Sequence, residues 1–204
     1  SFKKRELQEI LPENSKGLYV VPQILTNRAE GFLELAESLR NYGYREMNLN
    51  LGCPSRTVVS KGKGAGFLAF PEELNRFLDT VFSGLAAAAP DMRVSVKTRA
   101  GMESPEEFMR LLEIFNQYPL EELIVHPRVQ KDYYNNRPNL AVYRLAQQKS
   151  RALVCYNGDL FTRKDLEDFC AEFPEADRIM LGRGVIRDPG IAAERMTEEE
   201  AAER

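Results

Sequence analysis

Short apolar runs and segments with helical periodicity take turns along the chain. The runs have the length of buried strands, and between them apolar residues return every three or four positions, as on one face of a helix. The predicted strands cover 18–25, 44–51, 92–96, 122–125, 152–156 and 177–181, and the predicted helices carry apolar positions within 32–39, 74–81, 108–115, 139–148 and 166–170. Strict alternation of this kind favours a parallel sheet with crossover helices.

Two of the predicted helices carry a capping signal at their start. Ser104 is followed by Pro105, which suits the first helical position, and by Glu107 three residues on, so this segment predicts a capping box. Thr162 is predicted to be the N-cap of the last long helix.

Polar residues at the ends of successive strands decide between a barrel and an open doubly wound sheet. They are Asn50, Lys97, His126, Asn157 and the pair Gly182 and Arg183. In a barrel all strand ends meet at one mouth, whereas in an open sheet the outer strand ends lie far apart. The predicted fold is therefore α/β, a TIM (β/α)8-type barrel. This chain supplies about six consecutive strand-helix units of it, an incomplete barrel.

Composition narrows the class of protein further. The 204 residues suffice for one core, so we expect a single partial barrel domain over 1–204 and no second domain. The 43% hydrophobic and 29% charged residues are typical of a soluble globular protein. No apolar run approaches the roughly 20 residues of a membrane helix, and the start lacks a signal peptide's apolar core, so we expect a cytoplasmic protein without a membrane partner. A net charge of −3 gives no overall attraction to nucleic acid, so an RNA contact requires a local basic patch.

Cysteine usage argues against structural disulfides and against a metal. The chain has three cysteines and one histidine and lacks a Cys-x-x-Cys pair, so we expect neither a disulfide framework nor a metal site. Cys155 and Cys170 are predicted to be small buried hydrophobes. Cys53 differs because it lies on a loop between a strand and a helix, where barrel enzymes keep their chemistry. The nearby glycines 62, 64 and 66 have the wrong spacing for a dinucleotide-binding loop.

The last two strand ends indicate a phosphate site. Asn157-Gly158-Asp159 follows the penultimate strand, and Gly182-Arg183-Gly184 follows the last. Glycines let backbone N–H groups approach an anion, a following helix start favours negative charge, and arginine binds phosphate oxygens in a bidentate manner. In barrels the loops after the last two strands frequently bind phosphate, so we expect a phosphate-bearing cofactor or substrate.

Several of these segments occur in the order found in a known family. They are Asn50-Leu51-Gly52-Cys53-Pro54 with Val58 and Gly64-Ala65, Val96-Lys97-Thr98-Arg99-Ala100-Gly101, His126 with Arg128, Asn157-Gly158-Asp159, and Gly182-Arg183-Gly184 with Pro189. Together they resemble the tRNA-dihydrouridine synthases, FMN-dependent barrel oxidoreductases, over most of the chain. The resemblance implies the following roles: Cys53 is catalytic; Gln23, Lys97 and His126 contact the flavin ring; Asn157, Gly158, Gly182 and Arg183 hold its phosphate; Asn50, Arg99 and Tyr134 face the target uracil.

The reaction implied by the resemblance suits these residues. Flavin reduced by NADPH delivers a hydride to C6 of a uridine in tRNA, and Cys53 protonates C5 from the opposite side. A thiol is largely protonated at neutral pH, so it donates a proton without an activating base. The uracil has to leave its stack, which suits an aromatic residue such as Tyr134. The predicted basic rim for RNA consists of Arg56, Lys61, Lys63, Arg128, Lys131 and Arg137.

The chain also departs from the family pattern. Pro127-Arg128-Val129 stands where the family usually has Gly-Arg-Thr, and Phe67-Leu68 replaces two small or aliphatic residues. The family's first two strands and its C-terminal helical domain have no counterpart here, so we interpret the chain as the central part of a longer enzyme. We expect this fragment to bind flavin weakly, to be inactive by itself and to self-associate through open sheet edges.

Two other interpretations are compatible with the residues. One is a dihydroorotate dehydrogenase-like flavin barrel that acts on a free pyrimidine, although the Gly-Arg-Gly after the last strand disfavours it. The other is a non-catalytic RNA-binding remnant that has lost its flavin.

Overall fold

The computed structural model describes residues 4–193 and contains one six-stranded sheet in which every neighbouring pair is parallel. The strands are β1 (Gln23–Ile24), β2 (Glu46–Leu51), β3 (Arg93–Gly101), β4 (Glu122–Val129), β5 (Leu153–Tyr156) and β6 (Arg178–Ile179). They lie side by side in chain order. A doubly wound sheet reverses its strand order at a switch point, whereas a barrel keeps chain order. The barrel-type fold predicted from the sequence is confirmed.

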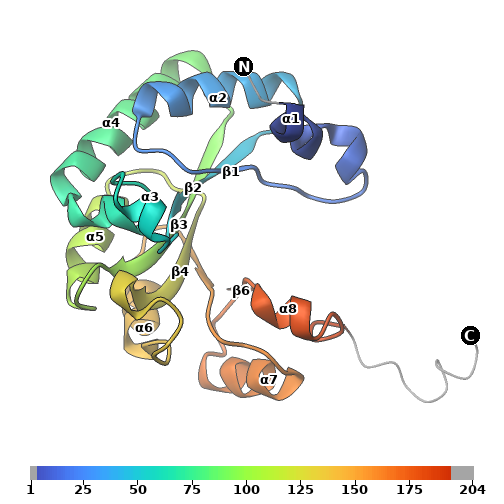
Figure 1. Cartoon of the computed structure of the whole chain (residues 1–204), viewed down its shortest axis with the longest axis vertical. Coiled ribbons are helices and arrows are strands. Elements are labelled where there is room, and N and C mark those ends of the chain that lie inside the picture. The colour runs from blue at the N-terminus through green and yellow to red at the C-terminus, as the bar shows by residue number, and fades with distance from the viewer. Residues whose placement is uncertain (1–3, 194–204) are drawn as a thin grey trace, which may run out of the picture.

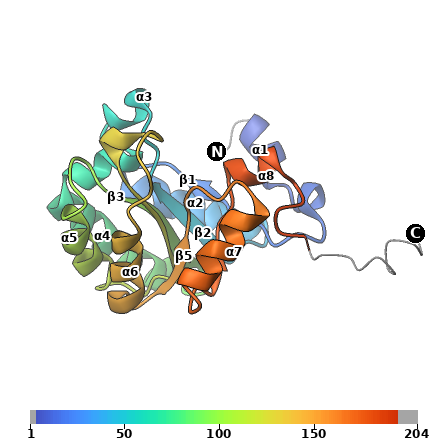
Figure 2. The same cartoon turned by 90° about the horizontal axis from the view of Figure 1, so that it is seen from below.

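Helices connect the strands and cover the outer face of the sheet (Figures 1 and 2). The α-helices are α1 (Lys4–Ile10), α2 (Ala29–Asn41), α3 (Arg56–Val59), α4 (Pro71–Ala88), α5 (Glu107–Phe115), α6 (Leu140–Lys149), α7 (Arg163–Glu172) and α8 (Arg183–Arg187), with 3₁₀ turns at Pro12–Ser15, Gly64–Ala69 and Gln130–Asp132. The main core lies between α2, α4, α5 and α6 and the strands, and includes the fully buried Phe32, Leu49 and Phe108. Within residues 4–193, no helix has the length and apolar composition needed to cross a membrane.

A second, smaller core joins α6, β5 and α7. It is aromatic: Tyr156 stacks on Phe169 with ring centroids 4.1 Å apart, and Tyr143 meets Tyr156 edge to face at 5.0 Å. This cluster holds the end of β5 in place, and β5 leads directly into Asn157 and Asp159.

The two capping predictions have different outcomes. Thr162 caps α7 as predicted, because its side chain accepts from the Asp165 N–H and the Asp165 carboxylate accepts from the Thr162 N–H. Only half of the predicted Ser104 capping box forms. The Glu107 carboxylate accepts the Ser104 N–H as predicted, and it also accepts the N–H groups of Met102 and Glu103. The Ser104 hydroxyl pairs with Glu106 and does not cap the helix, and α5 begins only at Glu107.

The outer strands are shorter than predicted. Only 23–24 of the predicted 18–25 and only 178–179 of 177–181 form ladder bonds, since each outer strand has one neighbour. Leu18 and Tyr19 are 72% and 76% exposed. The prediction for Cys170 is also wrong, because this residue on α7 is exposed, whereas Cys155 on β5 is buried as expected.

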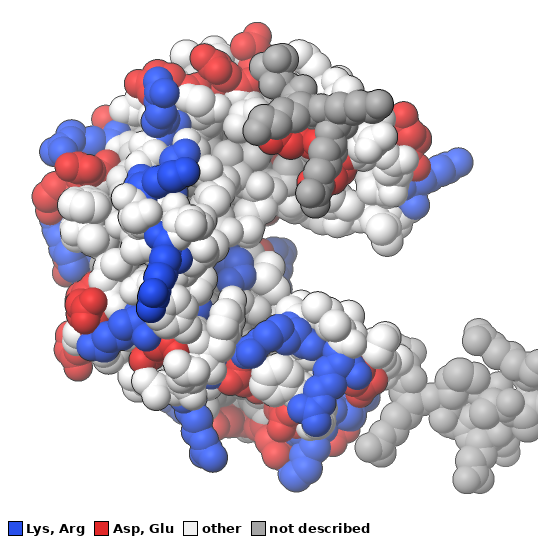
Figure 3. All heavy atoms as spheres, viewed as in Figure 1, with Lys and Arg blue, Asp and Glu red and all other residues white. Residues whose placement is uncertain are grey.

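The sheet curves without closing, so the molecule has the shape of a C (Figures 1 and 3). The opening lies between the β1 side with α1 and the β6 side with α8. Residues of α1 line a cavity of about 450 Å³ beside β1 and α2, and do not cover Leu25, which is 40% exposed. The open edges are therefore only partly shielded within residues 4–193.

These edges carry a prediction about the chain by itself. Unpaired parallel edges flanked by apolar side chains favour association with another chain. We expect the 204-residue chain to elute from size-exclusion chromatography as a species larger than a monomer, with much less than one flavin per chain. The full-length parent serves as the control, for which we expect a discrete species with bound flavin. A monomeric, stoichiometrically yellow 204-residue chain would contradict this account.

Candidate functional site

The carboxyl ends of the strands meet around one cavity of about 330 Å³. Its walls are formed by Gln23, Asn50, Gly52, Cys53, Pro54, Lys97, Arg99, His126, Tyr134, Asn157, Gly158, Asp159, Phe161, Met180, Gly182, Arg183 and Gly184. Every residue to which the family resemblance assigned a catalytic, flavin or uracil role lines this cavity, whereas the residues of the predicted basic rim do not. The structure thus brings the predicted residues together, while their individual roles stay predictions.

A chain of side-chain amides fixes the loop that carries Cys53. The Asn50 Oδ1 atom accepts the backbone N–H groups of Gly52 at 3.0 Å and Cys53 at 2.9 Å, and Asn50 Nδ2 donates to Gln23 Oε1 at 2.7 Å. Gly64 packs against the same loop with φ +56°, where a Cβ would lie 2.8 Å from the Cys53 carbonyl oxygen. The loop therefore needs glycine at 64, and it holds Cys53 half-buried at the cavity wall.

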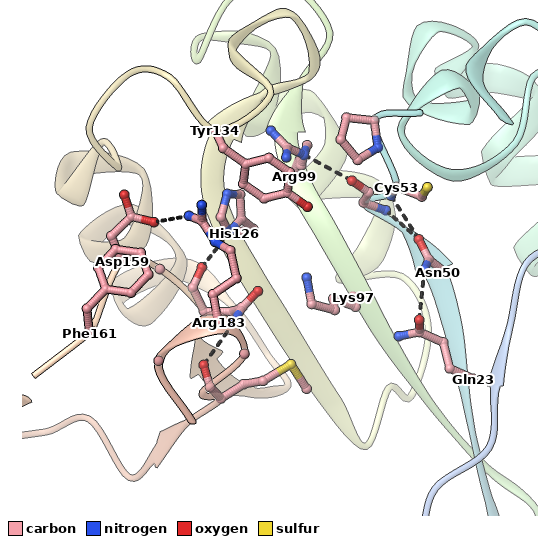
Figure 4. Close-up of a pocket in the computed structure, with 17 residues that line it drawn as sticks. Gln23, Asn50, Cys53, Lys97, Arg99, His126, Tyr134, Asp159, Phe161 and Arg183 are labelled. Atoms are coloured by element: carbon pink, nitrogen blue, oxygen red, sulfur yellow. Dashed lines mark hydrogen bonds and ion pairs between the residues drawn. The ribbon is translucent and has the colours of Figure 1, made fainter. Parts of the chain in front are cut away.

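Lys97 lies on β3 directly opposite Asn50 of β2 and points into the cavity (Figure 4). Within residues 4–193 its ammonium group has no hydrogen bond and no ion pair. Burial, and next the charge of Arg99, lower the pKa of Lys97 to about 8. A largely buried cation without a counter-charge is suited to an electron-rich or anionic ligand.

Arg99 also lines the cavity, but its donors are used within the protein. Its Nε, Nη1 and Nη2 atoms donate to the carbonyl oxygens of Gly52 at 3.0 Å, Val129 at 2.9 Å and Tyr133 at 2.7 Å. The side chain is 1% exposed. Arg99 thus joins the Cys53 loop to the segment after β4.

His126 on β4 is held by the end of β5. Its Nδ1 atom lies 2.7 Å from the carbonyl oxygen of Asn157, and Asn157 Nδ2 in turn donates to the Met180 carbonyl oxygen at 2.9 Å. Burial, and then the charges of Arg99 and Lys97, lower the pKa of His126 to about 3. The imidazole is therefore neutral at physiological pH.

Sequence reasoning misplaced Arg128. It assigned this residue to an exposed basic rim, yet the Arg128 side chain is 1% exposed and forms a two-pronged pair with the Asp159 carboxylate. Arg128 stands two residues after His126 on the same strand, so strand alternation places both side chains on the interior face. This alternation is the sequence signal that could have placed Arg128 in the interior.

Asp159 is shared between two arginines. Arg183 Nη2 donates to its Oδ1 atom at 2.8 Å, and the Arg183 guanidinium lies 4.5 Å from the centroid of the Tyr134 ring (Figure 4). Burial raises the pKa of Asp159, but the hydrogen bonds and charge of Arg128 and the charge of Arg183 outweigh this effect and lower it. Asp159 and its neighbour Phe161 are site residues to which sequence reasoning assigned no role.

The two glycines after β6 have different surroundings. A Cβ on Gly182 would meet nothing within 4 Å, so this residue leaves space at the cavity wall. A Cβ on Gly184 would lie 2.1 Å from the Leu160 carbonyl oxygen, so α8 can pack here only with glycine.

The cavity lining as a whole contains three cationic side chains and a single carboxylate, those of Lys97, Arg99, Arg183 and Asp159, and therefore favours an anionic ligand.

Basic side chains also gather on the face shown in Figure 3, over the region of α3 and away from the opening of the C. Arg56, Lys61 and Lys63 of the predicted rim belong to this region, and Arg56 and Lys61 are exposed. Arg137 is exposed as well, whereas Lys131 pairs with Glu103 at 3.4 Å. Contact of this rim with RNA stays a prediction.

Within residues 4–193, no cluster of three or more His, Cys, Asp or Glu side chains could hold a metal ion.

Comparison with known proteins places these features in context. Residues 2–204 match the family model described as dihydrouridine synthase. A probable tRNA-dihydrouridine synthase of Staphylococcus epidermidis is 28% identical over 175 residues, which are 83% of this chain and 52% of that protein. A tRNA-dihydrouridine(16) synthase of Yersinia pestis is 29% identical over 177 residues, 86% of this chain and 55% of that protein. The chain thus spans about half the length of the curated relatives it matches.

A solved structure supports the fold alone. A member of the enolase superfamily from Listeria innocua matches with a TM-score of 0.51 and 19% identity, covering 80% of this chain and 36% of that one.

Proposed function

The chain belongs to the dihydrouridine synthase family, and on this premise we propose that it forms most of the catalytic barrel of an enzyme that reduces specific uridines in tRNA to 5,6-dihydrouridine. FMN would be its cofactor and NADPH its reductant. The observation that carries the proposal is the meeting of Cys53 and Lys97 in one cavity, at the ends of adjacent strands. A proton donor and a cation suited to a reduced ring are the two groups that this chemistry needs.

The residues present fit FMN. The Lys97 ammonium is unpartnered within residues 4–193, and an anionic ring would supply the missing counter-charge. Gln23 on β1 and His126 on β4 line the same cavity, one on each side of Lys97 (Figure 4), and would complete the ring site. The phosphate would lie at the side of β5 and α8, held by Asn157, Gly158, Gly182 and Arg183. When bound, FMN would supply the hydride that C6 of the uracil receives.

Cys53 would supply the proton. One hydride at C6 and one proton at C5 saturate the double bond of the uracil ring, so the atoms and electrons balance. Cys53 becomes a thiolate in this step and regains its proton from solvent. Asn50 would keep the Cys53 loop at a fixed distance from the base through its bonds to the loop N–H groups.

The uracil would enter beside Tyr134, which is 50% exposed at the mouth. An extruded base gains stacking on an aromatic side chain, and Asn50 and Arg99 would face it from the cavity wall. The basic residues around α3 would contact the RNA backbone, since phosphate contacts position a nucleic acid. We place the enzyme in the cytoplasm, where such a substrate is found.

The proposal is tested with the full-length parent protein, NADPH and an unmodified tRNA transcript. We expect the purified protein to carry the absorbance of oxidised flavin, to oxidise NADPH, and to add two hydrogens to a uridine, detected by mass spectrometry of the digested RNA. A free pyrimidine nucleoside serves as the control substrate. Reduction of the nucleoside but not of the RNA would favour the alternative enzyme on free pyrimidines, and a colourless protein that binds tRNA would favour a non-catalytic module.

A further inference from the structure

Each ring nitrogen of His126 faces a group with a single hydrogen-bonding role, one that can only accept and one that can only donate. Nδ1 lies 2.7 Å from the Asn157 carbonyl oxygen, which only accepts hydrogen bonds, so Nδ1 carries the hydrogen. Nε2 lies 3.4 Å from Nη1 of Arg128, and a guanidinium only donates, so Nε2 presents its lone pair. The surroundings therefore select a single tautomer of the neutral imidazole.

Arg128 is itself held in place on several sides. Its Nη1 and Nη2 atoms both donate to the Asp159 carboxylate, and its Nε atom donates to the Asn136 carbonyl oxygen. Asp159 is fixed by a further bond from Arg183 at 2.8 Å. With 1% of the side chain exposed, Arg128 has no room to turn its donors away from His126.

A second proton on His126 would meet unfavourable neighbours on all sides except that of the Asn157 carbonyl, which already accepts the Nδ1 hydrogen. On β3, Lys97 and Arg99 are cationic, and on β4 the donor of Arg128 would face a second donor. The edge of Tyr134 approaches the ring, with centroids 6.2 Å apart. The one nearby carboxylate, Asp159 after β5, is already committed to Arg128 and Arg183. The lowering of the His126 pKa to about 3 agrees with this geometry.

We propose that Arg128, oriented by Asp159, is a positioning residue that holds His126 as the neutral Nδ1–H tautomer, so that His126 presents no N–H at Nε2 to the cavity. The tautomer assignment stands on the hydrogen bonds alone. Its consequence for catalysis rests on the proposed function: His126 does not supply the proton to the uracil, which leaves Cys53, Lys97 and Tyr134 as the neutral or cationic proton donors in the cavity lining that titrate.

The sequence offers a direct experiment because His126 is the only histidine of the chain. Because the 204-residue chain is expected to self-associate, it is labelled with ¹⁵N at histidine and measured by magic-angle-spinning NMR, which does not require a small particle and would give one pair of ring nitrogen signals. We expect one proton-bearing nitrogen, Nδ1, and one bare nitrogen, Nε2, with no change between about pH 8 and about pH 5. A proton on Nε2, averaged signals, or a titration near the ordinary histidine value would overturn the proposal.

Substitutions at 128 separate the hydrogen bond from the charge. In Arg128→Met both are lost, so we expect the His126 titration midpoint to rise by at least about one pH unit, a tenfold gain in proton affinity. Arg128→Lys keeps the charge but loses the fixed fork, so we expect tautomer averaging with a smaller rise. Lys131→Met removes a cation from the same segment that does not face His126 and is the matched control, for which we expect the parent spectrum.

Loss of Arg128 alone leaves the Asp159 carboxylate without its buried partner and can prevent folding. The double variant Arg128→Met/Asp159→Asn removes both charges and keeps the test available. A parent-like spectrum in the Met variants would overturn the role of Arg128. These spectra need neither flavin nor RNA, so an inactive full-length protein that retains the tautomer would refute only the proposed function, and an active one with an ordinary His126 would refute only this inference.

Discussion

Replacing Cys53 by alanine in the full-length parent is expected to slow dihydrouridine formation by about 10²–10⁴-fold, the usual effect of losing a general acid. Flavin reduction by NADPH should continue at the parent rate, because the cofactor contacts proposed here lie on β1, β3 and β4, on the loop after β5 and at the start of α8, and not on the Cys53 side chain. The two rates are measured separately, the first by mass spectrometry of the RNA and the second by the loss of flavin absorbance without oxygen.

Cys170→Ala is the matched control for this substitution. Cys170 is an exposed cysteine on α7 and does not line the cavity, so both rates should stay at the parent level. Turnover of the Cys53→Ala enzyme close to that of the parent would reject Cys53 as the proton donor and direct attention to Lys97.

The second large effect is expected at the flavin phosphate. Arg183→Ala removes a charge-assisted contact of about 1.5–3 kcal/mol, so flavin affinity of the full-length protein should fall by about one to two orders of magnitude. Arg183 also loses its bond to Asp159, but Asp159 keeps its two bonds from Arg128, so the wall of the cavity should persist. Titration of the deflavinated protein with FMN, followed by fluorescence, measures the change.

Arg187→Ala provides a control on the same helix. Arg187 belongs to α8 but does not line the cavity, so its loss should leave flavin affinity unchanged. If Arg183→Ala and Arg187→Ala bind FMN as tightly as the parent, the assigned phosphate site is wrong.

The sequence predicted the site better than it predicted the outer elements. A strand end is a local feature, marked where an apolar run stops at a polar residue, and barrel geometry then brings such ends together without further information. Asn50, Lys97, His126 and Asn157 were found in this way, although they are spread over more than half of the chain. The predicted ends at Lys97 and His126 are too early, because β3 and β4 continue to Gly101 and Val129.

Pairings between distant segments could not be predicted in the same way. Arg128 and Asp159 are 31 residues apart, and no local rule states that a basic residue will be buried against a particular carboxylate. The Ser104 capping box forms only in part because of a competing neighbour. The Ser104 hydroxyl pairs with Glu106 and not with the Glu107 N–H, whereas the Glu107 carboxylate does accept the Ser104 N–H.

The outer strands show a further limit of pattern reading. The residues of 18–25 have the apolar character of a strand, but a ladder forms only where a neighbour is present. β1 has β2 on one side, where Gln23 and Ile24 pair with Asn48 and Leu49, and has no sheet neighbour on the other side within residues 4–193.

The bonds of Arg99 determine how the mouth of the cavity can respond to a substrate. One guanidinium ties the Gly52 carbonyl of the Cys53 loop to the Val129 and Tyr133 carbonyls beside Tyr134. Moving either the Cys53 loop or the segment beside Tyr134 outward would break a charge-assisted hydrogen bond of the buried Arg99, so the two segments move together. The entrance therefore keeps its width and does not open and close like a lid. Under the proposed function, a flat pyrimidine ring would therefore have to enter without a widening of this gap.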